Sequence, residues 1–129
     1  MKSQREFPKT KASVAAARKF TRDVLSDLSE EVRDEVVLMT SELTTNALTH
    51  TDGAFVVTIE RTETAVRISV SDSSALAPVE RFPSAGQPHG RGLQIVNKLS
   101  DEWGSSRISG DGKTVWFRVD LRRAASVSN

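Results

Sequence analysis

Cysteine is absent from this chain of 129 residues, which excludes a disulfide framework, a thiolate zinc site and a cysteine nucleophile. The sequence also lacks a signal-peptide core and any apolar run long enough to cross a bilayer. We therefore expect a soluble, cytoplasmic protein that does not bind membranes. The formal net charge is only +1, which argues against direct binding to nucleic acid. The length fits one domain with one core.

The charges that are present lie unevenly along the chain. Residues 1–22 are basic, with Glu6 as their single acid, whereas residues 23–35 are rich in aspartate and glutamate. Acids near the start of a helix complement its dipole, so these residues could form ordinary solvated helix faces. The same distribution would also suit a polar docking surface for a protein partner. Both interpretations remain open at this point.

Hydrophobic periodicity and turn residues predict the order of the regular elements. Apolar side chains at helical spacing predict three helices, the second beginning after the N-cap Ser29, over residues 13–28, 29–50 and 92–99. Alternating apolar and polar side chains predict four strands, over residues 55–60, 65–71, 101–109 and 113–121. This order indicates an α+β fold, a two-layer sandwich with helices packed on one face of a mixed β-sheet.

The ends of the chain and one long internal segment lack such patterns. We expect residues 1–11 to be a flexible N-terminal segment, residues 12–121 to be the domain, and residues 122–129 to be a disordered tail. Residues 73–89 contain several prolines and a glycine, which break both helix and strand. A loop of this length in a compact domain is usually functional or mobile, although a static surface loop remains the alternative.

The second predicted helix carries a pair of polar side chains beside its apolar stripe. Glu42 and Asn46 are four positions apart, which places them about 40° apart around the helix and about 6 Å apart along it. A carboxylate and a carboxamide oxygen on one helix edge can together handle a hydrated divalent cation, as magnesium–phosphate sites require. A solvated polar flank is the plainer interpretation of this pair taken alone.

Three further motifs follow in a fixed order along the chain. Ser71-Asp72-Ser73-Ser74 follows a predicted strand, a glycine-rich segment over residues 86–96 runs into a helix, and residues 112–117 open the last strand. With the Glu42 and Asn46 motif, this order resembles the ATP-binding domain shared by sensor histidine kinases, gyrase B, Hsp90 and MutL. The chain looks most similar to the single-domain anti-sigma-factor serine kinases, over residues 12 to 121.

The resemblance implies that ATP and Mg²⁺ bind between the helix layer and the sheet. Asn46 would then coordinate the magnesium ion, and Glu42 would act as the general base. Asp72 would accept a hydrogen bond from the adenine amino group, which selects adenine over guanine. The family usually has glycine two residues after this aspartate, where the backbone passes close to the base, and this chain has Ser74.

The same resemblance implies a phosphate-binding segment and a lid. Gly90, Arg91, Gly92 and Leu93 would receive phosphate oxygens at the start of a helix, with Arg91 adding a charge-assisted contact. Thr114 matches the family threonine that reaches adenine directly or through water. Residues 73–89 would form an ATP lid.

The resemblance therefore implies a protein serine/threonine kinase that uses ATP. It would phosphorylate an anti-anti-sigma-type partner and, in the other partner state, sequester a sigma factor. The second hypothesis is a nucleotide-sensing protein-binding module of a partner-switching system that has lost catalysis, which the Ser74 substitution favours. A homodimer is compatible with either hypothesis.

Overall fold

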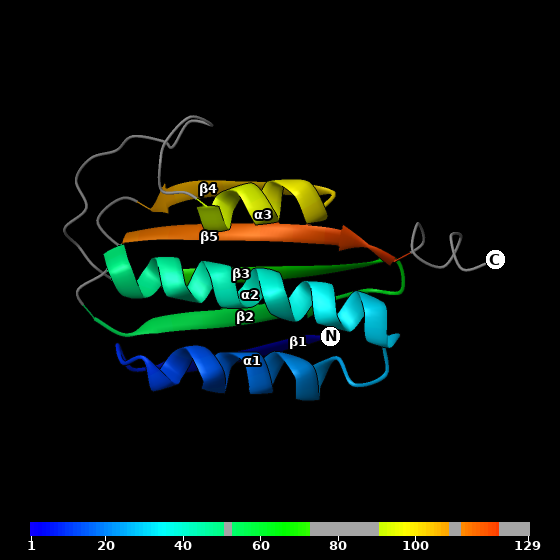
Figure 1. Ribbon diagram of the computed structural model, residues 1–129, viewed down its shortest axis with the longest axis horizontal. Coiled ribbons are helices and arrows are strands. Elements are labelled where there is room, and N and C mark those ends of the chain that lie inside the picture. The colour runs from blue at the N-terminus through cyan, green and yellow to red at the C-terminus, as the bar shows by residue number, and fades with distance from the viewer. Residues whose placement is uncertain (51–52, 73–90, 109–111, 122–129) are drawn as a thin grey trace.

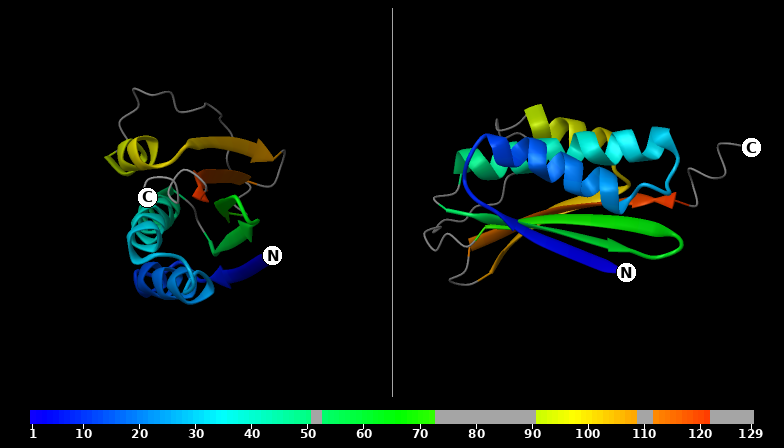
Figure 2. Two further views of the ribbon diagram at one scale, coloured as in Figure 1. Left: turned by 90° about the vertical axis from the view of Figure 1, so that its right-hand side faces the viewer. Right: turned by 90° about the horizontal axis from the view of Figure 1, so that it is seen from below.

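A computed structural model describes residues 1–50, 53–72, 91–108 and 112–121 of the chain. The elements are, in chain order, β1 (Lys2–Phe7), α1 (Ala12–Val24), α2 (Glu30–His50), β2 (Phe55–Arg61), β3 (Ala65–Asp72), α3 (Arg91–Leu99), β4 (Glu102–Ile108) and β5 (Gly112–Asp120). The three helices form one layer with α2 in the middle, and the five strands form the other (Figures 1 and 2). The predicted two-layer α+β sandwich is confirmed.

The sheet has the strand order β1-β2-β3-β5-β4. Every described pair of neighbouring strands is antiparallel, so the expected mixed sheet is wrong in this respect. The reason lies in the connections. β1 and β2 pair although two helices separate them, and β5 turns back from β4 to lie between β4 and β3. No strand therefore runs parallel to a described neighbour.

The sequence predicts that the N-terminal segment is flexible, but residues 2–7 of this segment form the edge strand β1. Its register against β2 runs from Lys2 opposite Glu60 to Phe7 opposite Phe55. The Phe7 ring is buried, stacks on Phe55 at a centroid distance of 5.8 Å and meets Phe20 edge-on at 6.1 Å. One aromatic side chain at the end of a charged strand anchors it to the core. The predicted tail, residues 122–129, lies outside the described residues.

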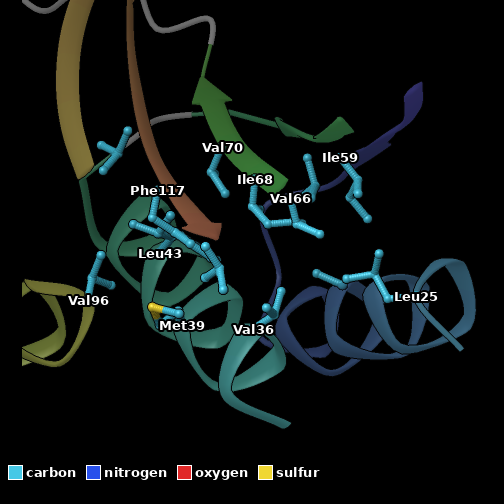
Figure 3. Packing of buried hydrophobic residues seen from close by; sticks show 14 of the residues in the cluster. Leu25, Val36, Met39, Leu43, Ile59, Val66, Ile68, Val70, Val96 and Phe117 are labelled. Atoms are coloured by element: carbon cyan, nitrogen blue, oxygen red, sulfur yellow. The ribbon is translucent and has the colours of Figure 1, made fainter. Parts of the chain in front are cut away.

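The core fills the space between α2 and the sheet. The apolar stripe predicted for α2 faces the core. Val36 and Met39 are 0% exposed and Leu43 is 1% exposed, while Val32 and Ala47 at the two ends of the stripe are partly buried. Figure 3 shows the three most buried of these side chains turned toward Ile68 and Phe117 of the central strands. The predicted N-cap is also present, because the backbone N–H of Val32 donates to Ser29 Oγ at 3.3 Å. The helix that carries the candidate site is therefore held firmly against β3 and β5.

Gly104 of β4 lies opposite Trp116 of β5 on the sheet face that points away from the helices. A Cβ added at Gly104 would lie 3.0 Å from Cζ2 of the indole and 3.2 Å from two further ring atoms. We expect Gly104→Ala to lower the free energy of unfolding by about 1–3 kcal/mol, because the ring has to shift. Gly53→Ala is the control, since nothing lies within 4 Å of its added Cβ. Equal urea midpoints for the two variants would contradict this account.

Asp27, in the connection between α1 and α2, binds the end of β2. Arg61 Nη1 donates to Asp27 Oδ1 at 2.6 Å, and this hydrogen bond holds the pKa of the Asp27 carboxyl below its ordinary value. A lowered folded-state pKa stabilises the fold above the unfolded-state pKa, and the contribution is lost as the pH falls through the folded-state pKa. We expect Asp27→Asn to be less stable than wild type at pH 7 and to approach it in acid. Urea unfolding at both pH values, with Glu63→Gln as control, measures the difference. A difference that persisted in acid would contradict this account.

Candidate functional site

Helix α2 presents Glu42 and Asn46 along the flank that faces α3. Arg18 of α1 donates to Ser41 Oγ at 3.2 Å, and this contact shows that the Ser41 flank of α2 lies next to α1. Because successive helical residues turn by about 100°, Glu42 and Asn46 project on the other flank, beside the buried Met39. α2 lies between α1 and α3 in Figure 1 and contacts both. Both side chains are half-buried, so each is oriented by its surroundings and still reachable.

Asp72 lies at the carboxyl end of β3, at the same end of the molecule as the last turns of α2 (Figure 1). It is opposite Phe55 in the register and alternates in phase with the buried Val70, which places it on the helix-facing side of the sheet. Asp72 is half-buried. A carboxylate at this position can accept a hydrogen bond from a ligand bound between the two layers.

Thr114 lies in β5 and contacts β3, and the adenine contact predicted for it stays a prediction. Its hydroxyl is 2.8 Å from Ser71 Oγ, and the two residues are opposite each other in the register of β3 and β5. Because Val115 next to it is buried on the helix side, Thr114 points to the opposite face of the sheet, away from Asp72. The structure therefore does not bring the Thr114 and Asp72 side chains together. Sequence reasoning assigns no role to Ser71, whose hydroxyl is the partner of Thr114. The alternation of side chains along β3 is the signal that could have placed Ser71 on the outer face of the sheet.

The start of α3 is the remaining described part of the predicted site. α3 begins at Arg91, one residue before the predicted start, and it contacts α2. Leu93 is partly buried and packs against the core, so it anchors the first turn of α3. In Figure 1 this first turn lies at the same end of the molecule as the end of α2. Ser74, Gly90 and the predicted lid over residues 73–89 lie outside the described residues.

The donor set of the site fits a nucleotide with a hydrated magnesium ion. The Asn46 carboxamide oxygen, with the Glu42 carboxylate nearby on the same edge of α2, leaves the other positions around a cation for water and phosphate oxygens, which is how Mg²⁺ usually binds with nucleotides. Within the described ranges, no group of three His, Cys, Asp or Glu side chains lies close enough together to hold a metal ion without phosphate ligands.

The helices of the described part include none that could span a membrane.

Comparison with known families agrees with this geometry. The family model of the histidine kinase-like ATPase domain matches residues 7–119, from the last residue of β1 almost to the end of β5. No curated protein sequence matches the chain significantly. The matched region contains α2 with Glu42 and Asn46, the end of β3 with Asp72, and the start of α3. The chain thus belongs to the family of histidine kinase-like ATPase domains, which are ATP-binding domains.

Proposed function

We propose that this protein is an ATP-dependent serine/threonine kinase that phosphorylates an anti-anti-sigma-type partner and, in its other partner state, sequesters a sigma factor. The observation that carries the proposal is the placement of Glu42 beside Asn46 on the half-buried, α3-facing flank of α2, at the end of the molecule where β3 ends in Asp72. A domain that only bound ATP would need the polar anchor and the cation ligand. It would not need a carboxylate base.

Phosphate transfer to the partner would form one phosphorus–oxygen bond and break another. A serine Oγ of the partner forms a bond to the γ-phosphorus of ATP, while the bond from that phosphorus to the β–γ bridging oxygen breaks and ADP leaves. The Glu42 carboxylate takes the proton of the serine hydroxyl. Because Glu42 is half-buried, its side chain has fewer orientations available than an exposed glutamate and is held ready to accept this proton.

Asn46 and Asp72 hold the nucleotide in this scheme. The Asn46 carboxamide oxygen would hold a magnesium ion without repelling the phosphate charge, and the ion, when bound, neutralises charge on the phosphate oxygens. Asp72 orients the adenine at the other end of the nucleotide, because it lies on the helix-facing side of the sheet at the end of β3. The two residues come from different layers of the sandwich, so ATP would be bound between the layers.

A catalytically inactive, nucleotide-sensing binding module is the second candidate function. The observation in its favour is Ser74, which replaces the usual glycine of the family two residues after the aspartate. Phosphate transfer separates the two candidates. The protein is mixed with γ-labelled ATP, magnesium and a serine-bearing partner purified by pull-down from a lysate of the native cells. Label on a partner serine supports the kinase, and ATP binding without any transfer supports the binding module.

The adenine contact can be tested by itself. Asp72→Asn keeps the size of the side chain but can present an N–H to the adenine amino group, so we expect ATP binding to weaken by about 1–3 kcal/mol. The wild type should also prefer ATP to GTP, and the variant should prefer it less. Isothermal titration with both nucleotides measures these differences, and Asp23→Asn on the exposed side of α1 is the control. Equal ATP affinities for Asp72→Asn and wild type would exclude the contact.

A further inference from the structure

Helix α3 is only nine residues long, so its position depends on packing and not on its own helical propensity. Val96 is fully buried in the core (Figure 3), and Leu93 and Leu99 are partly buried and packed against it. These three side chains recur every three residues, so they hold one face of α3 against the rest of the domain. Apolar contacts of this kind have no direction, so they resist removal of the helix more than they resist a small tilt.

A directional contact ties the last turn of α3 to the sheet. The indole Nε1–H of Trp103 in β4 donates to Asn97 Oδ1 at 2.9 Å. Trp103 lies opposite the buried Phe117 in the register, which puts its ring on the helix-facing side of the sheet, where it packs against the core. An indole has a single N–H donor on a rigid plane, so a ring held by packing fixes the direction of this hydrogen bond. The end of the helix is also closed by Ser100, whose Oγ donates to Val96 O at 2.6 Å.

The first turn of α3 is the part whose position matters for a nucleotide. The family resemblance assigns phosphate binding to this turn, and α3 contacts α2, which carries Glu42 and Asn46. Arg91, the first residue of α3, is six positions before Asn97, or about 9 Å along the helix. A tilt of about 10° about Asn97 would therefore move the first turn by roughly 1.5 Å. Hydrogen bonds tolerate a range of only about 0.5 Å, so such a tilt would break contacts to phosphate oxygens.

We propose that Trp103 is a positioning residue for the phosphates of the nucleotide. Its indole N–H holds Asn97, and Asn97 in turn sets the angle at which the first turn of α3 meets the phosphates. This role rests on the proposed use of ATP and adds the group that fixes the phosphate-binding end of the site. Neither residue has to touch the nucleotide, because Asn97 lies in the last turn of α3 and Trp103 lies near the start of β4.

Two variants remove the hydrogen bond from its two sides. Trp103→Phe keeps an aromatic ring in the core but has no N–H, and Asn97→Ala removes the acceptor at an exposed position of α3. We expect each variant to weaken ATP binding about tenfold, since a misplacement of about 1 Å can cost about 10²-fold in a well-oriented site. Adenosine, which has no phosphate, should bind each variant as it binds wild type. The double variant should bind ATP no more weakly than either single variant, because both changes remove the same contact.

Isothermal titration with ATP and magnesium and NMR titration with adenosine measure these affinities. Gln94→Ala changes another exposed side chain of α3, and Trp116→Phe changes the tryptophan that lies under Arg67 on the other face of the sheet. Both controls should bind ATP as wild type does. The indole N–H signal of Trp103 reports the contact directly. In the nucleotide-free protein it should exchange with solvent faster in Asn97→Ala than in Gln94→Ala.

Several outcomes would overturn the positioning role. They are unchanged ATP affinity in both single variants, equal losses for ATP and adenosine, losses that add in the double variant, and equal indole exchange in Asn97→Ala and Gln94→Ala. Because Asn97 is exposed, Asn97→Ala decides the matter if Trp103→Phe fails to fold. A wild type that bound no ATP would overturn the proposed function together with this role. ATP binding that is equally tight in wild type and in the variants would overturn this role alone.

Discussion

Glu42→Gln is expected to lower the rate of phosphate transfer by roughly 10²–10⁴-fold while ATP still binds with nearly unchanged affinity. The glutamine keeps the size and the hydrogen-bonding reach of the glutamate but cannot take the proton of the attacking hydroxyl. Met39 and Leu43, close to it on α2, are buried and hold the helix against the sheet, so the exchange should not disturb the helix. Single-turnover transfer to the serine-bearing partner and isothermal titration with ATP measure the two quantities separately.

Glu35→Gln is a close control for this variant. Glu35 is seven positions before Glu42, which is two helical turns along the same flank of α2, and it is also half-buried. The control removes an equivalent carboxylate from the same flank without touching the proposed base, so its transfer rate should match wild type. Full activity in Glu42→Gln would show that Glu42 is not the base. Equal losses in both variants would indicate a general effect of charge on α2.

Asn46→Ala is expected to abolish the part of the nucleotide affinity that depends on magnesium. Removing residues that only support a metal ligand already costs about 10–100-fold in metal affinity, so loss of a direct ligand should cost at least about 100-fold. ATP titrations with magnesium and with excess EDTA give the two affinities for each protein. The variant should bind ATP equally weakly in both conditions, whereas wild type should bind much more tightly with magnesium.

Thr45→Ala is the control for Asn46→Ala, because Thr45 is the neighbouring residue of α2 and is exposed to solvent. It should keep the full magnesium effect. Asn46→Asp provides a further comparison, since the carboxylate still offers an oxygen but adds charge close to the phosphates. If Asn46→Ala retained the magnesium effect of wild type, the ion would have to be held by other residues.

The helices and four of the five strands can be predicted because their signals are local. The apolar spacing of α2, its Ser29 cap and the alternation in β2 and β3 each occupy a few neighbouring residues. The periodicity predicts that the first helix reaches residue 28, but α1 ends at Val24, although Leu28 still packs against the core. The helical periodicity continues past the end of the helix because the following turn also buries apolar side chains.

The strand β1 cannot be predicted in the same way. Its residues are mostly charged or polar, and only Phe7 is buried. What makes it a strand is the pairing with β2, in which Lys2 lies opposite Glu60, far along the chain. The antiparallel sheet has the same origin, because the position of β5 between β3 and β4 depends on contacts that no local pattern records.

Local sequence patterns predict one part of the candidate site, and the other part depends on the pairing of the strands. The edge of α2 with Glu42 and Asn46 follows from the sequence alone, since helical spacing is enough to place two side chains together. The same kind of local reasoning places Asp72 at a strand end. To decide which face of the sheet a strand residue lies on, however, one must know the register of the paired strands. Only the pairing of Ser71 with Thr114 shows that the threonine hydroxyl points away from the face that bears Asp72.

Local patterns in the sequence are enough to predict the regular elements apart from β1, the buried stripe of α2, and the residue types available for nucleotide and cation binding. Only the folded chain shows how the strands pair, on which face each strand residue lies, and which flank of α2 turns toward α3. The difference comes from the range of the interactions. Periodicity and capping act within a few residues, whereas strand pairing and layer packing join residues that only the folded chain brings together.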